Sequence, residues 1–244
     1  MAIEVFLKEK QASFIEHLEE LRRRIIASIL CILILSIIGF IFAPRILDFI
    51  IRWTNIGTAY FFTPFEALLV NIKVAIFFGL FFSAPFILYE TWAFIGPGLT
   101  RKEQNISLPF LLSGIILFLI GCAFAYFILI PVGLKFFFSF GTENLKPMMN
   151  INKILEFIIW CIIGCGFLFQ MPLLVFFLIR LGVVNISTLT RHRAEFIVAI
   201  LIISAIITPT GDMFTLLLIS VPLIILIEIS ILLARITIRK KERI

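Results

Sequence analysis

The chain has 244 residues, of which 61% are hydrophobic and only 15% are charged. Soluble domains are about 45–50% apolar and about 25% charged, so this composition excludes an ordinary soluble protein and indicates an integral membrane protein. A net charge of +6 would favour nucleic-acid binding in a soluble protein. Here the basic residues lie mostly at the ends of apolar runs, so we expect no nucleic-acid partner.

The segment SFIEHLEELRRRI comes just before the first long apolar run. Ser13 and Glu16 fit a capping box, which predicts that a helix begins there. Glu20 and Arg24 continue from Glu16 at steps of four residues, so they lie along one face of this helix. The pattern by itself favours a salt-bridged helix lying on the membrane surface. The alternative is that one glutamate stays available for a cationic ligand.

Six apolar runs follow along the chain, and each is a candidate span because a helix needs about 20 apolar residues to cross a bilayer. The six predicted spans are residues 25–43, 67–89, 109–130, 154–181, 196–207 and 214–234. The fifth is short, and only the turn sequence TPTGDM separates it from the sixth. Either polar flanking residues extend this helix or the bilayer thins around it. The prediction is a single all-α membrane domain covering residues 1–244.

The basic residues are unevenly divided between the two sides of the predicted membrane. If the N-terminus lies on the side of synthesis, most of the 21 lysines and arginines fall on that side. Both termini are therefore expected on the cytoplasmic or stromal side. The far-side loops, residues 44–66 and 131–153, are long and contain aromatic stretches that suit the membrane interface. The polar first twenty residues do not resemble a signal peptide, so we expect insertion from the compartment of synthesis.

Few polar residues lie inside the predicted spans. Gln170 in FLFQMPLL and Glu228 in LIILIEISILL are each near the middle of a span, where a polar group either joins helices or serves function. Lys73 is close enough to one end of its span to reach the surface. The four cysteines lie in apolar runs without neighbouring histidine or carboxylate, so they are predicted to be core residues.

Two long stretches resemble the TatC family, the multispanning subunit of the twin-arginine protein translocase. They are HLEELRRRI and TPFEALLVNIKVAIFFGLFFSAPFILYETWAFIGPGLTRKE. The stretches GCAFAYFILIP, FQMPLL and ITPTGDMFTLLLISVPLIILIEIS extend the resemblance over nearly the whole chain. It implies a cupped bundle of six helices that binds twin-arginine signal peptides and exports folded proteins with the proton-motive force. It also implies single-span partners of the TatA and TatB type, and several copies of this chain in one complex.

The resemblance also assigns roles to individual residues. The positions that match the signal-peptide site of the family are Glu20, Leu21, Arg22, Phe94, Pro97 and Glu103. The positions that match contacts with partner subunits are Gln170, Glu66 and Asp212. Some relatives have glutamate at the position of Gln170, so this chain departs from a charged contact there. In this reading the carboxylates of Glu20 and Glu103 bind the paired arginines of the signal.

Two other functions stay open on the residues alone. A proton-coupled small-solute transporter would use Glu228 and Gln170 as a relay near the middle of the membrane. A purely structural subunit would bind no signal peptide. The sequence has no hydrolase motif, nucleotide-binding loop or metal-ligand motif, so we predict no enzyme activity, cofactor or metal. The 29 phenylalanines suggest AT-rich codons and a plastid thylakoid membrane, with a bacterial or mitochondrial inner membrane as alternatives.

Overall fold

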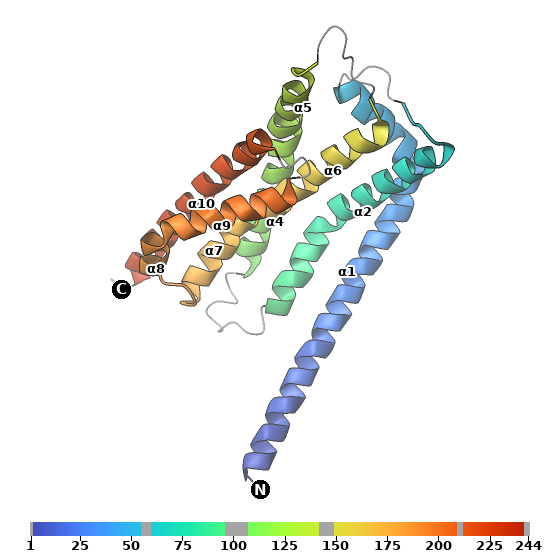
Figure 1. Cartoon of the computed structure of the whole chain (residues 1–244). Helices are drawn as coiled ribbons and strands as arrows, with labels where there is room; N and C mark the ends of the chain where they lie inside the picture. Colours follow the sequence, from blue (N-terminus) through green and yellow to red (C-terminus); the bar gives the residue numbers. More distant parts are fainter. Residues whose placement is uncertain (1, 55–59, 96–106, 142–148, 209–211, 242–244) are drawn as a thin grey trace. The chain divides into compact units, whose positions relative to one another are not determined.

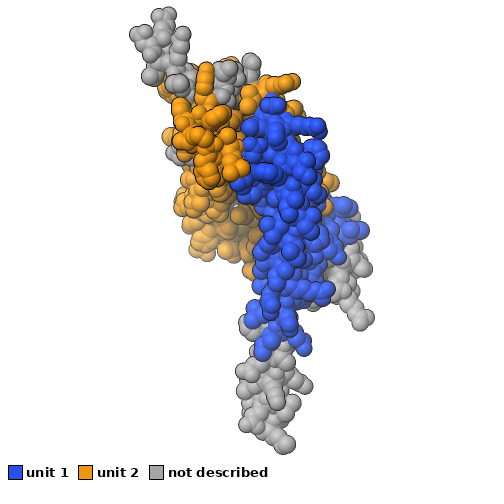
Figure 2. All heavy atoms as spheres, turned by 90° about the vertical axis from the view of Figure 1, so that its right-hand side faces the viewer, with its two compact units in different colours: residues 1–48, 71–112 blue, residues 49–70, 113–244 orange. Residues whose placement is uncertain are grey.

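The structure is a computed structural model that describes residues 2–54, 60–95, 107–141, 149–208 and 212–241, with the backbone only at 2–14, 107 and 237–241. Within these ranges the chain is helical apart from turns and one isolated backbone bridge, between Tyr60 and Asn150. The chain divides into two compact units, which are coloured in Figure 2. Unit 1 is Met1–Asp48 with Asn71–Leu112, and unit 2 is Phe49–Val70 with Ser113–Ile244.

Unit 1 consists mainly of two long helices, α1 (Ala2–Thr54) and α2 (Pro64–Ile95), drawn in blue and cyan in Figure 1. They pack antiparallel through small side chains. Gly79 of α2 lies directly against Ser36 of α1, and Gly39 of α1 lies against α2 in the same way. Small residues let two helix backbones approach closely, which is how helices commonly associate in membranes.

Helix α1 is longer at both ends than the sequence predicted. It begins at Ala2, so the predicted start at Ser13 is wrong: the preceding residues include alanine, glutamate, leucine and lysine, which favour helix, and no proline or glycine. It also continues through Pro44 to Thr54 instead of ending in a loop over residues 44–66. A proline removes one backbone hydrogen bond, and a helix packed on its neighbours can continue past it.

Unit 2 contains the remaining helices and a short π-helical turn. They are α4 (Ser107–Phe124), η2 (Ala125–Leu129), α5 (Ile130–Phe138), α6 (Ile151–Leu168), α7 (Met171–Arg180), α8 (Ile186–Arg191), α9 (Arg193–Ile207) and α10 (Met213–Lys241), of which the first begins in unit 1. Helix α10 packs against α7 and α9, and α6 packs against η2 and α9 (Figure 1). The most deeply buried side chains include Leu129, Ile130, Leu155, Ile158 and Leu223.

The third predicted span ends later than expected. The π-helical turn joins α4 to α5, and the helix then continues through Pro131 to Phe138. The amide of Ile130 bonds to the carbonyl of Ala125, five residues earlier, so the hydrogen-bond register widens just before the proline that has no N–H to donate. Residues 131–138, predicted as the start of a far-side loop, are therefore helical.

The fourth predicted span is interrupted, although the sequence predicted one helix over residues 154–181. Helix α6 ends at Leu168 and α7 begins at Met171, with Phe169 and Gln170 in a turn. Pro172 is at the start of α7, where its missing N–H costs little.

Five helices in the described part of the chain are long and apolar enough to cross a membrane. They are Ile15–Thr54, Pro64–Ile95, Leu108–Phe138, Ile151–Arg180 and Met213–Ile236. The fifth predicted span corresponds to α9, which has 15 residues and is shorter than these. A multi-pass, all-α membrane protein is therefore confirmed, while the count of six spans stays a prediction.

Candidate functional site

A compact cluster of charges joins the two helices of unit 1. Arg24 of α1 donates to Glu20 through Nη2 at 2.6 Å and through Nε at 3.1 Å. It also donates through Nη1 to Glu90 of α2 at 2.7 Å. Two carboxylates therefore share one guanidinium group, and the three side chains together carry a formal charge of −1.

The helix pairing explains how these residues meet. Glu20 and Arg24 are four residues apart on α1, so they lie on one face of the helix. Glu90 is 66 positions from Arg24 in the chain and is brought to it by the antiparallel contact of α1 with α2. The three side chains are partly buried: 32% of Glu20, 24% of Arg24 and 15% of Glu90 is exposed. Ion pairs in such a setting are screened less by salt than fully exposed pairs.

An aromatic contact extends this cluster. The rings of His17 and Phe94 are stacked, with centroids 4.3 Å apart and an angle of 15° between planes. The Nδ1 atom of His17 is also 3.8 Å from the second carboxylate oxygen of Glu20. Phe94 and Glu20, both expected in the signal-peptide site, thus lie in one cluster with the histidine between them.

The remaining expected site residues are placed only in part. Leu21 is half-buried on α1, and Arg22 is exposed. Arg22 lines a surface depression of about 580 Å³ together with Glu16, Glu19, Glu20, Arg23 and Ile26. Pro97 and Glu103 lie outside the described residues.

Glu90 is the residue that the sequence reasoning missed. It stands in YETWAF, within the second stretch that resembles the TatC family, and the sequence pattern assigned no role to its carboxylate. A signal was present, because Glu90 is four residues before Phe94 and so shares its face of α2. His17, Glu20 and Arg24 share a face of α1 by the same rule. A contact between this face of α1 and the face of α2 that carries Glu90 and Phe94 could therefore have been predicted from the sequence.

The three expected partner-contact residues all belong to unit 2. Gln170, in the turn between α6 and α7, donates through Nε2 to the carbonyl oxygen of Gly114 at 3.0 Å. Glu66 accepts from the backbone N–H of Phe62 at 2.7 Å, and Asp212 accepts from that of Thr215 at 2.8 Å. The two acids thus stabilise the starts of α2 and α10. A contact with a partner subunit stays a prediction for all three.

The two polar groups of the alternative transporter relay have different partners. Glu228 of α10 pairs with Arg193 at the start of α9, at an N–O distance of 3.1 Å. The amide of Gln170 bonds to α4 instead. In the described part of unit 2, no hydrogen bond connects Gln170 with Glu228, and a relay between them therefore lacks this direct link.

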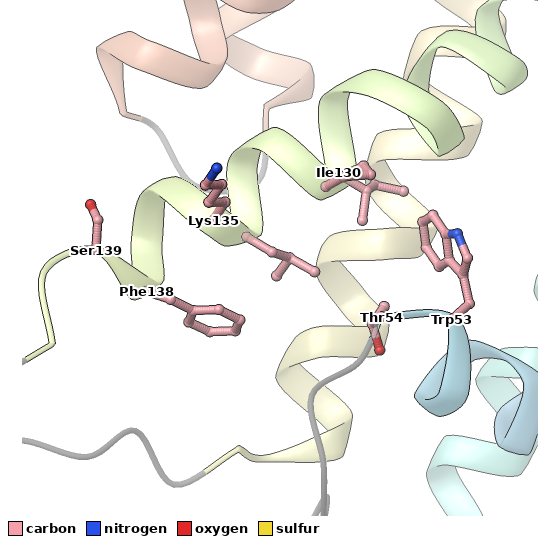
Figure 3. Close-up of a pocket in the computed structure, with 8 residues that line it drawn as sticks. Trp53, Thr54, Ile130, Lys135, Phe138 and Ser139 are labelled. Carbon is pink, nitrogen blue, oxygen red and sulfur yellow. The ribbon is translucent and has the colours of Figure 1, made fainter.

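Unit 2 also has a pocket of about 540 Å³, shown in Figure 3. It is lined by Trp53, Thr54, Ile130, Pro131, Leu134, Lys135, Phe138 and Ser139. The Lys135 side chain points away from Trp53 and Thr54 (Figure 3). Among the side chains that the structure describes, no group of three or more histidines, cysteines or carboxylates could hold a metal ion.

Comparison with known proteins places this arrangement in a family. The model of the family described as Sec-independent protein translocase protein (TatC) matches residues 16–222. The chain belongs to the TatC family. It is 37% identical to the Sec-independent protein translocase protein TatC of Aquifex aeolicus over 94% of this chain and 97% of that protein.

A tatC-like protein and a solved TatC structure extend the comparison. An uncharacterized tatC-like protein, ycf43, of Gracilaria tenuistipitata var. liui is 35% identical over 93% of this chain and 95% of its own length. A crystal structure of a twin-arginine translocase receptor, TatC, superposes with a TM-score of 0.78 and is 35% identical. That match covers 90% of this chain and 98% of the TatC chain in the crystal.

Proposed function

We propose that this chain is the receptor subunit of a twin-arginine translocase and that it binds the signal peptide at the cluster of Glu20, Arg24 and Glu90. The observation that carries the proposal is that two carboxylates, on two helices, already hold a guanidinium group at 2.6 and 2.7 Å. A carboxylate that binds one arginine in this geometry can bind another. The relatives named as translocase proteins and receptors support the same reading.

The second arginine of the signal would bind Glu103, as the resemblance to the family implies. Each guanidinium group forms charge-assisted hydrogen bonds with a carboxylate, and the planar fork makes these bonds directional. An exposed ion pair contributes about 0–1 kcal/mol, and partial burial raises this. Recognition would therefore depend on two arginines bound at once, with Phe94 and Leu21 contacting the apolar part of the signal.

The remaining parts of the machinery follow from the family. Single-span partners of the TatA and TatB type would contact unit 2 near Gln170, Glu66 and Asp212. Several copies of the chain would assemble in one complex that exports folded cargo with the proton-motive force. Both termini would lie on the cytoplasmic or stromal side of a cupped six-span bundle. The tatC-like relative ycf43 of Gracilaria supports a thylakoid membrane. The bacterial relatives support a bacterial inner membrane as the alternative.

Binding of a fluorescent twin-arginine signal peptide to the purified protein in lipid nanodiscs tests the site. We expect Glu20→Ala and Glu103→Ala each to weaken binding about 10-fold, which corresponds to about 1.4 kcal/mol. Glu195→Ala, which removes an exposed carboxylate from α9, is the matched control and should bind like the wild type. A peptide with both arginines replaced by lysine should bind weakly to every variant. Wild-type affinity in both Glu20→Ala and Glu103→Ala would refute the proposed site.

A further inference from the structure

The cluster of unit 1 contains its own arginine. We propose that Arg24 is an internal occupant of the arginine site, which an incoming signal guanidinium displaces from Glu20 while Glu90 retains it. The inference rests on the proposed function and concerns how the same site is regulated. It gives Arg24 and Glu90 roles in selectivity that are separate from holding the peptide.

The geometry suits an exchange of partners. Arg24 uses Nε and Nη2 for Glu20 and Nη1 for Glu90, so the group can leave one carboxylate without leaving the other. Both bonds to Glu20 end on the same oxygen, Oε1. Its other oxygen, Oε2, lies 3.8 Å from Nδ1 of His17, which is too long for a hydrogen bond. An incoming donor can therefore bind Oε2 before Arg24 leaves Oε1.

The difference in exposure sets the direction of the exchange. The Glu20 side chain is 32% exposed and Glu90 is 15% exposed, so a peptide arriving from solvent reaches Glu20 first. Glu90 is the more buried carboxylate, and a buried carboxylate that loses its cation is costly. Arg24 is therefore expected to stay with Glu90.

The charge balance also favours the exchange. Before binding, two carboxylates share one guanidinium group, which leaves one negative charge uncompensated. After binding, Glu20 pairs with the signal arginine and Glu90 pairs with Arg24, so each carboxylate has its own cation. Binding therefore removes the uncompensated charge, and Arg24 keeps Glu90 as its partner throughout. Loss of Glu90 would leave a displaced Arg24 without a partner.

Competition with Arg24 accounts for selectivity. A ligand must replace the two N–H···O bonds that Arg24 makes with Glu20. A signal arginine can do so because its planar guanidinium group presents two parallel donors to a carboxylate. A lysine is a point charge without that fork. Its interaction with Glu20 therefore compensates less for the hydrogen bonds that Arg24 loses. Arg24 thus lowers the affinity for every cationic peptide, and for lysine peptides most.

A double-mutant cycle in full-length protein tests the exchange, with twin-arginine and twin-lysine signal peptides as probes in nanodiscs. We expect Arg24→Gln to bind the twin-arginine peptide about 3- to 10-fold tighter and the twin-lysine peptide tighter by a larger factor. Glu90→Gln should bind the twin-arginine peptide a few-fold weaker. In the Arg24→Gln background the same Glu90→Gln change should alter affinity less than about twofold, because Arg24 is no longer there to retain.

Two controls separate the exchange from simpler effects. Arg191→Gln removes the same charge from an exposed position in unit 2, so equal tightening in this variant would mean a general electrostatic effect and overturn the inference. Arg24→Lys keeps the charge but loses the fork, and it should also reduce selectivity for arginine. If this variant and Arg24→Gln both bind no tighter than wild type while Glu20→Ala still weakens binding, the exchange is refuted and the receptor function stands. Equal binding of both peptides by wild type would refute the receptor function itself.

Discussion

At the scale of single residues, the partners of a charge determine its role more than its position in an apolar run. Glu228 was predicted near the middle of the sixth span, but it pairs with Arg193, the first residue of α9. Helix α9 has 15 residues, and Glu228 is 15 positions after the start of α10 at Met213. The two antiparallel helices therefore place Glu228 level with the polar start of α9.

Exchange of the charges in this pair provides a test of its role. We expect Glu228→Arg to lower stability because two arginines then face each other, and Arg193→Glu to do the same with two glutamates. The double variant should recover most of the loss, with a coupling energy of about 0.2–1 kcal/mol because both side chains are about half exposed. Thermal unfolding of the four proteins in detergent measures this coupling. Strictly additive losses would show that the pair contributes nothing.

At the scale of elements, the contact of α1 with α2 decides whether the charge cluster can form. Gly79 faces α1, and a Cβ at this position would lie 2.7 Å from the carbonyl oxygen of Ile32 and still closer to Oγ of Ser36. Gly39 is in a similar position, because its Cβ would lie 2.8 Å from Cβ of Phe78. Glycine is therefore required at both positions by close approach of the helices.

Enlarging Gly79 should separate the two helices. We expect Gly79→Val to cost about 1–3 kcal/mol of stability through overpacking. It should also weaken signal-peptide binding, because Glu90 would move away from Arg24. Ile76→Val, at a side chain of α2 that is 47% exposed, is the matched control and should change stability by less than about 0.5 kcal/mol. Unfolding in detergent and peptide binding are the two measurements, and wild-type values for Gly79→Val in both would contradict the close contact.

At the scale of the whole molecule, the number of membrane crossings depends on α9. At about 1.5 Å per residue its 15 residues are about 22 Å long, which is less than the roughly 30 Å of a hydrocarbon core. A helix this short can cross where the bilayer thins or where flanking side chains reach the interface. Its antiparallel packing against α10, with Arg193 at one end, suits a crossing of this kind.

The parity of the crossings gives a direct test of this proposal. Six crossings place the two termini on the same side of the membrane, and five place them on opposite sides. We expect epitope tags at both ends to be digested together by a protease added to the synthesis side of sealed vesicles. A third tag inserted within residues 142–148, in the predicted far-side loop, should be protected and serves as the control. Digestion of only one terminal tag would establish an odd number of crossings.

Much of the fold could be predicted from the sequence because it depends on local composition. The length of an apolar run determines whether a helix can cross a bilayer, and the runs at residues 67–89 and 214–234 lie inside α2 and α10. The predictions failed at prolines: Pro44 was read as the end of a helix that continues through it, and Pro131 as the start of a loop. Whether a proline ends a helix depends on whether neighbouring elements support the backbone beyond it.

The sequence by itself determined that this is an all-α membrane protein and that Glu20 and Arg24 lie on one helix face, because composition and i, i+4 spacing are local properties. Only the tertiary structure decided that Glu90 completes their cluster. Its partner is 66 positions away, and the pairing depends on how α1 and α2 pack against each other. Two glutamates of the same helix, α2, therefore have different roles in the structure. Glu90 pairs with Arg24 of α1, and Glu66 accepts a backbone hydrogen bond at the start of α2.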